Sequence, residues 1–221
     1  MGGDRTITIT PSFINELGLH LSNTLPGVMA QVKMTPGPPY IPPLARKEGD
    51  AMPSAVLMLL FEEEEKWSFF LMERSNNVEY HRGQISLPGG AQEKGENLEE
   101  TALRETKEEI GIVPRSVNML GEITPLFIPA SGFRVHPFVG WTKMAPEVTI
   151  DRNEVAALHK VKVEKLLDDS RTKQEQREIR GFNVNVPYFH LNQLKVWGAT
   201  AAILSECKDI FSKCYSMENA L

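Results

Sequence analysis

Glutamates are concentrated between residues 96 and 109, around a single arginine, Arg104. Successive residues of an α-helix turn by about 100°, so Glu105, Glu108 and Glu109 are expected on one helical face. Like charges at these spacings destabilise a helix by a few tenths of a kcal/mol per pair, so we expect a compensating positive charge. Hard divalent cations prefer carboxylate oxygens, and Mg²⁺ commonly combines one or two carboxylates with substrate phosphates. The pattern therefore points to metal-assisted chemistry at a phosphate group.

Length, charge and cysteine content narrow the classes of protein to which the chain can belong. It has 221 residues, of which 41% are hydrophobic, and a net charge of −5, so we expect one globular domain with appendages. No basic block points to a nucleic-acid partner, and no apolar run approaches the roughly 20 residues that cross a membrane. The two cysteines, Cys207 and Cys214, lack the spacing of a zinc site, and a reducing, cytoplasmic setting fits them best. The sequence leaves a homodimer open.

The elements that must position these glutamates are indicated by capping and hydrophobic patterns. Asn97 and Glu100 have the spacing of a capping box, and Gly111 is placed as a C-terminal stop, so a helix is predicted over residues 98–110. Upstream, the apolar runs SAVLMLLF and WSFFLMER flank EEEEK, which predicts a β-hairpin with a solvated acidic turn.

The remaining segments complete a mixed α/β fold in which a sheet lies between helices. Residues 1–52 are interpreted as an N-terminal arm, with a short strand in RTITIT and a proline-rich linker, and residues 53–221 as the catalytic domain. Strands are predicted in SVNMLGEITPLFI and GFRVHPFVGWT, a helix in NEVAALHKVKVEKLLDD, a hairpin in FNVNVPYFHLNQLKVWG and a C-terminal helix in ATAAILSECKDIFSKCY.

The order of residues around the predicted helix resembles the Nudix box, the signature of hydrolases that act on nucleoside diphosphates linked to another moiety. Thr106 departs from the family pattern, which usually has an apolar residue there, and we interpret this as a packing change because the threonine methyl can still face a core. The positions that carry the resemblance are Gly90, Glu96, Arg104, Glu105, Glu108, Glu109, Gly111 and Ile112.

The resemblance implies a Nudix fold, a small-molecule nucleotide substrate and a bound Mg²⁺ or Mn²⁺. By this likeness, the glutamates at 105, 108 and 109 are metal ligands or the base that activates water. Glu96 and Arg104 hold the loop, and Arg104 is also a member of the catalytic set. Gly90 and Gly111 are positions of special backbone geometry. Glu154 is placed where related hydrolases have a further acidic metal ligand, although a glutamate that opens a helix is also favourable for its charge alone.

The segment before the box, residues 71–90, is similar to the motif of coenzyme A pyrophosphatases. Glu79 replaces an expected arginine and Leu87 an expected aromatic residue, while His81 and Arg82 are candidates to restore the basic charge. The substrate implied is coenzyme A or acyl-coenzyme A, and the products are 3′-phospho-AMP and 4′-phosphopantetheine. The matching positions are Arg74, Ser75, Gly83, Pro88, Gly89 and Gly90, and those expected to bind substrate are Arg74, Ser75, Arg82, Gly83 and Gly89.

Two other functions stay open at the level of sequence. Glu79 keeps ADP-ribose, dinucleoside polyphosphates and nucleoside triphosphates possible as substrates. A non-catalytic, nucleotide-sensing Nudix module is the other alternative, and the intact glutamates of the box argue against it. Trp197 and Phe133 are aromatic residues near predicted strand ends, where side chains commonly belong to the core but also stack on an adenine.

Overall fold

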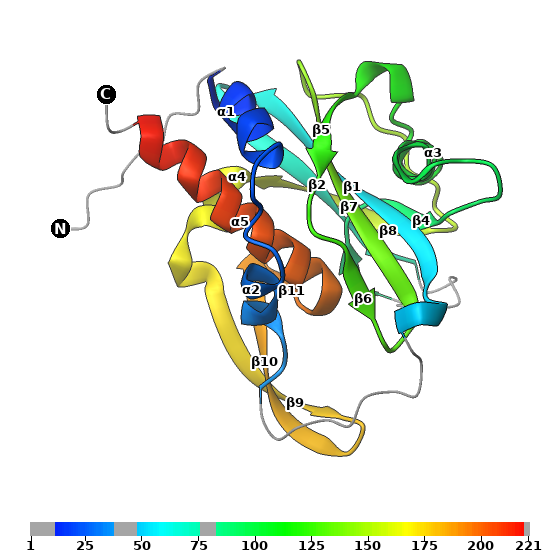
Figure 1. Cartoon of the computed structure of the whole chain (residues 1–221), viewed down its shortest axis with the longest axis vertical. Coiled ribbons are helices and arrows are strands. Elements are labelled where there is room, and N and C mark those ends of the chain that lie inside the picture. Colours follow the sequence, from blue (N-terminus) through cyan, green and yellow to red (C-terminus); the bar gives the residue numbers. More distant parts are fainter. Residues whose placement is uncertain (1–11, 38–47, 76–82, 219–221) are drawn as a thin grey trace.

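The computed structural model describes residues 12–37, 48–75 and 83–218. Figure 1 shows a central sheet with helices on both of its faces and a smaller sheet that extends away from it. The mixed α/β architecture expected from the sequence is confirmed.

The predicted hairpin is formed by β1 (Met52–Glu63) and β2 (Lys66–Arg74), which pair antiparallel. The turn between them consists of Glu64 and Glu65, whose φ angles of 52° and 59° lie in the left-handed region. Both side chains are exposed, as expected for a solvated acidic turn.

The main sheet has the order β3-β2-β1-β7-β5, with β4 on β1, β6 on β7 and β8 on β2. Its one parallel pairing in the described chain joins β1 to β7, in the register Met52↔Phe133 to Phe61↔Thr142. The further strands are β3 (Ile85–Ser86), β4 (Gly89–Ala91), β5 (Asn118–Glu122), β6 (Leu126–Ile128), β7 (Phe133–Thr142) and β8 (Val155–Lys162).

Strand β1 is buried on both faces, which explains its continuous apolar sequence. Side chains alternate across a strand, so Met58 and Leu60 join a cluster with α1 (Ser12–Leu21) and α5 (Gly198–Glu218). Leu57 and Leu59 point the other way, into a second cluster beneath α3 (Leu98–Ile110). Figure 1 accordingly shows α3 on one side of the sheet and α1 with α5 on the other.

The prediction of a helix in NEVAALHKVKVEKLLDD is wrong over most of that segment. Residues Val155–Lys162 form β8, and only Val163–Leu167 form a helix, α4. Strand β8 pairs antiparallel with β2, from Ser68↔Lys162 to Glu73↔Ala157. Alanine, leucine and lysine favour a helix locally, but the free edge of β2 supplies backbone hydrogen bonds along the whole segment, and tertiary pairing overrides the propensity.

The smaller sheet contains three antiparallel strands in the order β11-β10-β9. The predicted hairpin is β10 (Phe182–Leu191) with β11 (Leu194–Val196), while β9 (Thr172–Ile179) was not expected because its sequence, TKQEQREI, is almost entirely polar. The small sheet is followed in the chain by α5, the predicted C-terminal helix. Both cysteines lie on this helix, where they are buried and form no disulfide.

The N-terminal residues described contribute to the core. Phe13 is 1% exposed and its ring lies edge-on to that of Phe211 on α5, with centroids 5.5 Å apart.

The remaining helical elements are short. After α1 come α2 (Val28–Gln31) and 3₁₀ turns at Val32–Met34 and Glu48–Asp50, and two more 3₁₀ turns cover Pro114–Ser116 and Asp169–Arg171. The segment RTITIT and residues 38–47 of the proline-rich linker lie outside the described residues, and the division at residue 52 stays a prediction. No helix in the described ranges is long and apolar enough to span a membrane.

Candidate active site

The glutamate-bearing helix, α3, begins and ends as its sequence predicts. The Asn97 side chain accepts a hydrogen bond from Glu100 N at 2.9 Å, and the Glu100 carboxylate accepts one from Asn97 N at 2.8 Å. This capping box satisfies two backbone donors at the helix start. Gly111 ends the helix with a φ of 78°, a left-handed conformation that favours glycine.

Arg104 is the centre of a hydrogen-bond network that joins the helix to the preceding loop. Its Nε and Nη2 donate to the two carboxylate oxygens of Glu96 at 3.0 and 2.9 Å. Nη2 also donates to Ala91 O at 3.1 Å, and Nη1 donates to Glu105 and Glu108 at 2.9 and 2.8 Å. This network lowers the pKa of Glu96 to about 2, chiefly through the hydrogen bond from Arg104. Arg104 thus links Glu96 and Ala91 of the loop to the helix, and the role of Glu96 and Arg104 in holding the loop stays a prediction.

Glu109 is the most buried carboxylate of the box, with only 1% of its side chain exposed. Its Oε2 accepts a hydrogen bond from Gly89 N at 2.8 Å, and its Oε1 lies 3.3 Å from Arg74 Nη1. Burial raises its pKa to about 8, the contacts with Gly89 and Arg74 oppose that rise, and the charges of Glu105 and Glu154 add to it.

Glu105 and Glu108 occupy different environments although both contact Arg104. Glu105 is 15% exposed and its pKa is raised by burial, whereas Glu108 is 56% exposed. Gly90 lies directly against Glu105: a Cβ at this position would stand 2.5 Å from the carboxyl carbon. The glycine is thus required here for close approach rather than for an unusual dihedral angle.

Glu154 lies beside the helix although it is distant in sequence. Its carbonyl accepts a hydrogen bond from Ser75 N at 2.7 Å, and its charge raises the pKa of both Glu105 and Glu109. The structure therefore brings Glu105, Glu109 and Glu154 into electrostatic contact. Glu108 is largely exposed, accepts a hydrogen bond from Arg104, and also raises the pKa of Glu105 through its charge.

The donor set fits a hard divalent cation. The charge of Glu154 raises the pKa of Glu105 and Glu109, and the charge of Glu105 also raises the pKa of Glu109. These carboxylates repel one another, and a cation among them would relieve the repulsion. Within the described residues, no three acidic, histidine or cysteine side chains already form a cluster that could hold a metal ion. Arg104 and Arg74 instead engage carboxylate oxygens of Glu105 and Glu109, so these arginines neutralise the charge that a metal would otherwise share.

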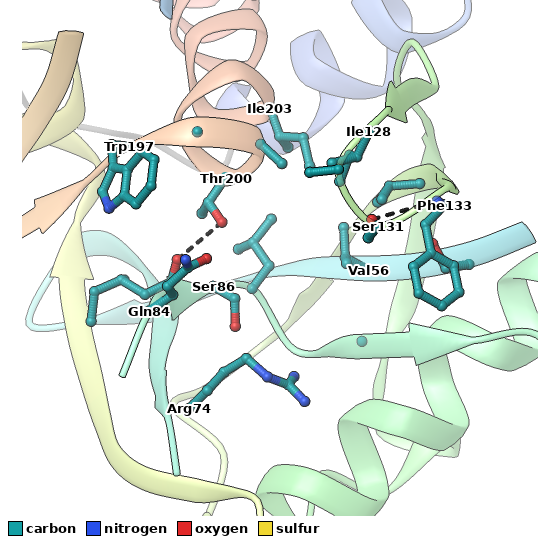
Figure 2. A pocket seen from close by; sticks show the side chains of 18 of the residues that line it. Val56, Arg74, Gln84, Ser86, Ile128, Ser131, Phe133, Trp197, Thr200 and Ile203 are labelled. Atoms are coloured by element: carbon teal, nitrogen blue, oxygen red, sulfur yellow. Dashed lines mark hydrogen bonds between the residues drawn. The ribbon is translucent and has the colours of Figure 1, made fainter. Parts of the chain in front are cut away.

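A cavity of about 860 Å³ opens next to Glu109. Arg74 and Gly89, which both contact Glu109, also line this cavity, as does Gly90. Much of the remaining wall is apolar. Figure 2 shows side chains that approach it from several elements, including Val56, Ile128, Phe133, Trp197 and Ile203.

Only some of the residues expected to bind substrate line the cavity. Arg74 and Gly89 are in the cavity wall, whereas Ser75 and Gly83 are not among the residues that line it. Ser75 is buried and donates its N–H to Glu154, and Gly83 N donates to Arg74 O at 3.0 Å. Arg82 lies outside the described residues.

Sequence reasoning did not identify the far side of the cavity. It is formed by Ile128, Ser131 and Phe133 around the start of β7, by the β9–β10 turn, and by the start of α5. Trp197 and Phe133 were considered for base stacking, and both line the cavity. The other apolar residues have the composition of ordinary core positions, and no local spacing distinguishes them.

Comparison with known proteins places this geometry in a family. A NUDIX domain model matches residues 51–181. Nudix hydrolase 3 of Caenorhabditis elegans is 30% identical over 169 residues, which are 69% of this chain and 70% of the relative. A protein named uncharacterized Nudix hydrolase NudL, from Pectobacterium atrosepticum, is 34% identical over 148 residues, which are 63% of this chain and 72% of the relative.

Solved structures show the same fold at low sequence identity. RenU, a Nudix hydrolase from M. smegmatis, has a TM-score of 0.52 and 16% identity and covers 73% of this chain and 86% of its own. A binary complex of a C. elegans Ap4A hydrolase has a TM-score of 0.50 and 17% identity and covers 77% of this chain and 100% of its own. The family model matches more than half of the chain, and the relatives agree with it, so the chain belongs to the Nudix family and is a Nudix pyrophosphohydrolase.

Proposed function

We propose that the chain hydrolyses the diphosphate of coenzyme A or acyl-coenzyme A to 3′-phospho-AMP and the corresponding 4′-phosphopantetheine. The observation that carries this proposal is the cavity beside Glu109. Its volume of about 860 Å³ is near the upper end of the roughly 300–1,000 Å³ typical of ligand pockets. A mononucleotide alone would leave much of it empty, whereas a nucleotide with a long, partly apolar arm suits both its size and its walls.

The polar groups of the site are distributed as a diphosphate would require. Arg74 lines the cavity and reaches Glu109, so its guanidinium can donate to a phosphoryl oxygen next to the carboxylates. Gly89 N–H fixes Glu109 Oε2, and Arg104 orients Glu105. We propose Glu105, Glu109 and Glu154, with Glu108 after a side-chain rotation, as the groups that hold Mg²⁺ or Mn²⁺ or accept the proton of the attacking water. A divalent cation bound there supplies neutralisation of phosphoryl charge and a lowered pKa for water.

Two alternatives give distinct experimental results. Solved Nudix structures include an Ap4A hydrolase, and the cavity of this chain contains two aromatic residues, Phe133 and Trp197, which would suit a substrate with two bases. A nucleotide-sensing module without catalysis is opposed by the retention of Glu105, Glu108 and Glu109 on α3 and by the burial of Glu109.

A substrate panel tests the proposal. Coenzyme A, acyl-coenzyme A, ADP-ribose, NADH, diadenosine polyphosphates and nucleoside triphosphates would be incubated with Mg²⁺ and then Mn²⁺, and products resolved by chromatography. We expect the highest kcat/KM for coenzyme A compounds, with release of 3′-phospho-AMP, and no turnover in excess chelator. Preference for another diphosphate would replace the proposed substrate, full activity in chelator would exclude the metal, and no turnover of any compound would favour the sensing module.

A further inference from the structure

Trp197 differs from the other two tryptophans and from Phe133 in what surrounds it. Within the described chain, Trp67 and Trp141 pack against each other, with centroids 6.2 Å apart, in or against the larger hydrophobic cluster. Phe133, the other aromatic residue of the cavity wall, also packs against that cluster. Trp197 belongs to neither hydrophobic cluster, yet it lines the cavity. Core packing therefore does not account for this large apolar ring.

One face of the Trp197 ring is covered by a charged group. The guanidinium carbon of Arg177 lies 4.5 Å from the centroid of the indole, within the range of a cation–π contact. Arg177 is not among the residues that line the cavity, whereas Trp197 is. The guanidinium therefore covers part of the indole without entering the cavity, and the cavity is in contact with the indole itself.

Arg177 is itself held in place by the small sheet. Its Nε donates to Glu175 Oε1 at 2.5 Å on the same strand, β9, and Glu175 also pairs with Lys195 on β11. These ion pairs lower the pKa of Glu175 below its usual value, so the carboxylate stays charged at neutral pH. The ion pairs of Glu175 with Lys195 and Arg177 hold the Arg177 guanidinium against the indole. This contact restricts the orientation of the Trp197 ring.

The neighbouring backbone adds a polar environment to this surface. Gly198 follows Trp197 directly with a φ of 66° and has no atom within 4 Å of the position of a Cβ. The chain turns there into α5, so the first residues of that 21-residue helix, Gly198, Ala199 and Thr200, line the cavity. Figure 2 shows Trp197 and Thr200 on one side of the cavity and Arg74 on another. The first N–H groups of a helix have no acceptor within the helix, so an apolar plane next to them suits a base that is joined to a phosphorylated sugar.

We propose that Trp197 is the stacking surface for the base of the nucleotide substrate, with Arg177 as the residue that positions its ring. In the proposed reaction this base is the adenine of coenzyme A, and to that extent the inference rests on the proposed function. Stacking on an aromatic side chain recognises the flat π-face of a base. It places the nucleotide end of the substrate at α5 and leaves the apolar wall around Ile128, Val56 and Phe133 for the other arm.

Binding of the two halves of the substrate tests this assignment without catalysis. 3′-Phospho-AMP contains the base, and 4′-phosphopantetheine does not. In calorimetric titrations with Mg²⁺ present, Trp197→Leu is expected to weaken 3′-phospho-AMP roughly 5- to 100-fold and to leave 4′-phosphopantetheine unchanged. Trp197→Phe, which keeps an aromatic plane, is expected to recover most of the loss. In the wild type, 3′-phospho-AMP should quench tryptophan fluorescence, and Trp141→Phe should retain that quenching.

The outcomes separate this inference from the proposed function. If the wild type hydrolyses coenzyme A but Trp197→Leu binds 3′-phospho-AMP as the wild type does, the stacking assignment is wrong and the function stands. If Trp197→Leu weakens both ligands equally, the residue has only a structural role, and the assignment again fails. If coenzyme A is not hydrolysed but Trp197→Leu selectively weakens 3′-phospho-AMP and AMP, the stacking surface is supported for another adenine nucleotide.

Discussion

The carboxylate region and the cavity beside it differ in how their parts are brought together. In the carboxylate region, a loop and one helix supply nearly every group between residues 89 and 111, and a single side chain, Arg104, makes five hydrogen bonds within it. The cavity wall comes from β1, β2, β3, β4, β6, the start of β7, the end of β9 with the turn that follows it, and the start of α5. Its polar contacts are few and its surface is mainly apolar.

This difference separates the chemistry of the enzyme from its specificity. Most hydrogen bonds that position these carboxylates close within about twenty residues. Their positions therefore depend mainly on local sequence, and the contact of Glu109 with Arg74 is the longer-range exception. A wall assembled from distant segments changes whenever any one of them changes. The catalytic part is therefore expected to control kcat, and the cavity is expected to control KM and the choice of substrate.

The largest effect is expected from Glu109→Gln, which replaces the most buried carboxyl group of the box with an amide that can neither accept a proton nor serve as an anionic metal ligand. Loss of a metal ligand or of a positioned base should reduce kcat by roughly 10²- to 10⁴-fold, while KM changes little because the cavity wall is intact. The measurement is steady-state kinetics with Mg²⁺ on the best substrate of the panel. Glu99→Gln is a matched control, since Glu99 is exposed on the same helix. Wild-type turnover in Glu109→Gln would remove this carboxylate from the reaction and reverse the proposed division of roles.

The sequence predicted the carboxylate region well because its physics is local. The capping box of Asn97 and Glu100 and the stop at Gly111 fix the bounds of α3, and Arg104 meets glutamates as its fork geometry suggested. The buried position of Thr106, which is 1% exposed, also agrees with a side chain that faces the core. What the sequence did not reveal is that Arg74 and Gly89, rather than other box residues, provide the partners of Glu109.

Prediction failed where pairing between distant segments decides the structure. β8 was expected to be a helix, because alanine, leucine and lysine favour one and nothing in those residues reveals that β2 offers a free edge. β9 was missed because it is a polar strand whose partner, β10, provides the apolar side. The cavity depends on both sheets and on α5, so its lining could not be derived from spacing, and Trp197 could be assigned to it only in three dimensions.

A smaller effect is expected from Gly90→Ala, which tests how closely the local network holds Glu105. The new Cβ would lie 2.5 Å from the carboxyl carbon of Glu105. Because that atom is at the end of a flexible side chain, the side chain can move aside at little cost in stability. A displaced carboxylate should still lower kcat on the order of tenfold to a hundredfold.

Thermal unfolding and kinetics together check this prediction. The expected result is a large change in kcat with little change in Tm. Gly49→Ala is the control, because no atom lies within 4 Å of its Cβ position and neither quantity should change. An unchanged kcat in Gly90→Ala would mean that catalysis tolerates a displaced Glu105 carboxylate, and that its position against Gly90 is not critical.

The smallest effect on catalysis, but a clear one on stability, is expected from Glu96→Gln. The carboxylate accepts hydrogen bonds from Arg104, Thr101 Oγ1 and Glu93 N, and its pKa is lowered from 4.5 to about 2, chiefly by Arg104. A carboxylate whose folded pKa is depressed contributes stability above its unfolded pKa, and that contribution is lost as pH falls through the folded pKa. Glu96→Gln should therefore lower the free energy of unfolding by about 1–3 kcal/mol at pH 7.

The pH dependence of that loss distinguishes the ion-pair network from simple packing. Between pH 7 and about 4.5 the difference in unfolding free energy between wild type and Glu96→Gln should stay constant. Below pH 4.5 it should narrow and nearly vanish towards pH 2, because the wild-type carboxylate then becomes protonated as well. Urea unfolding at pH 7, 4 and 3, with Glu99→Gln as the exposed control, measures this difference. A gap that persists unchanged at pH 3 would assign the effect to the shape of the side chain, and the charge network around Arg104 would then no longer explain how the loop is held to α3.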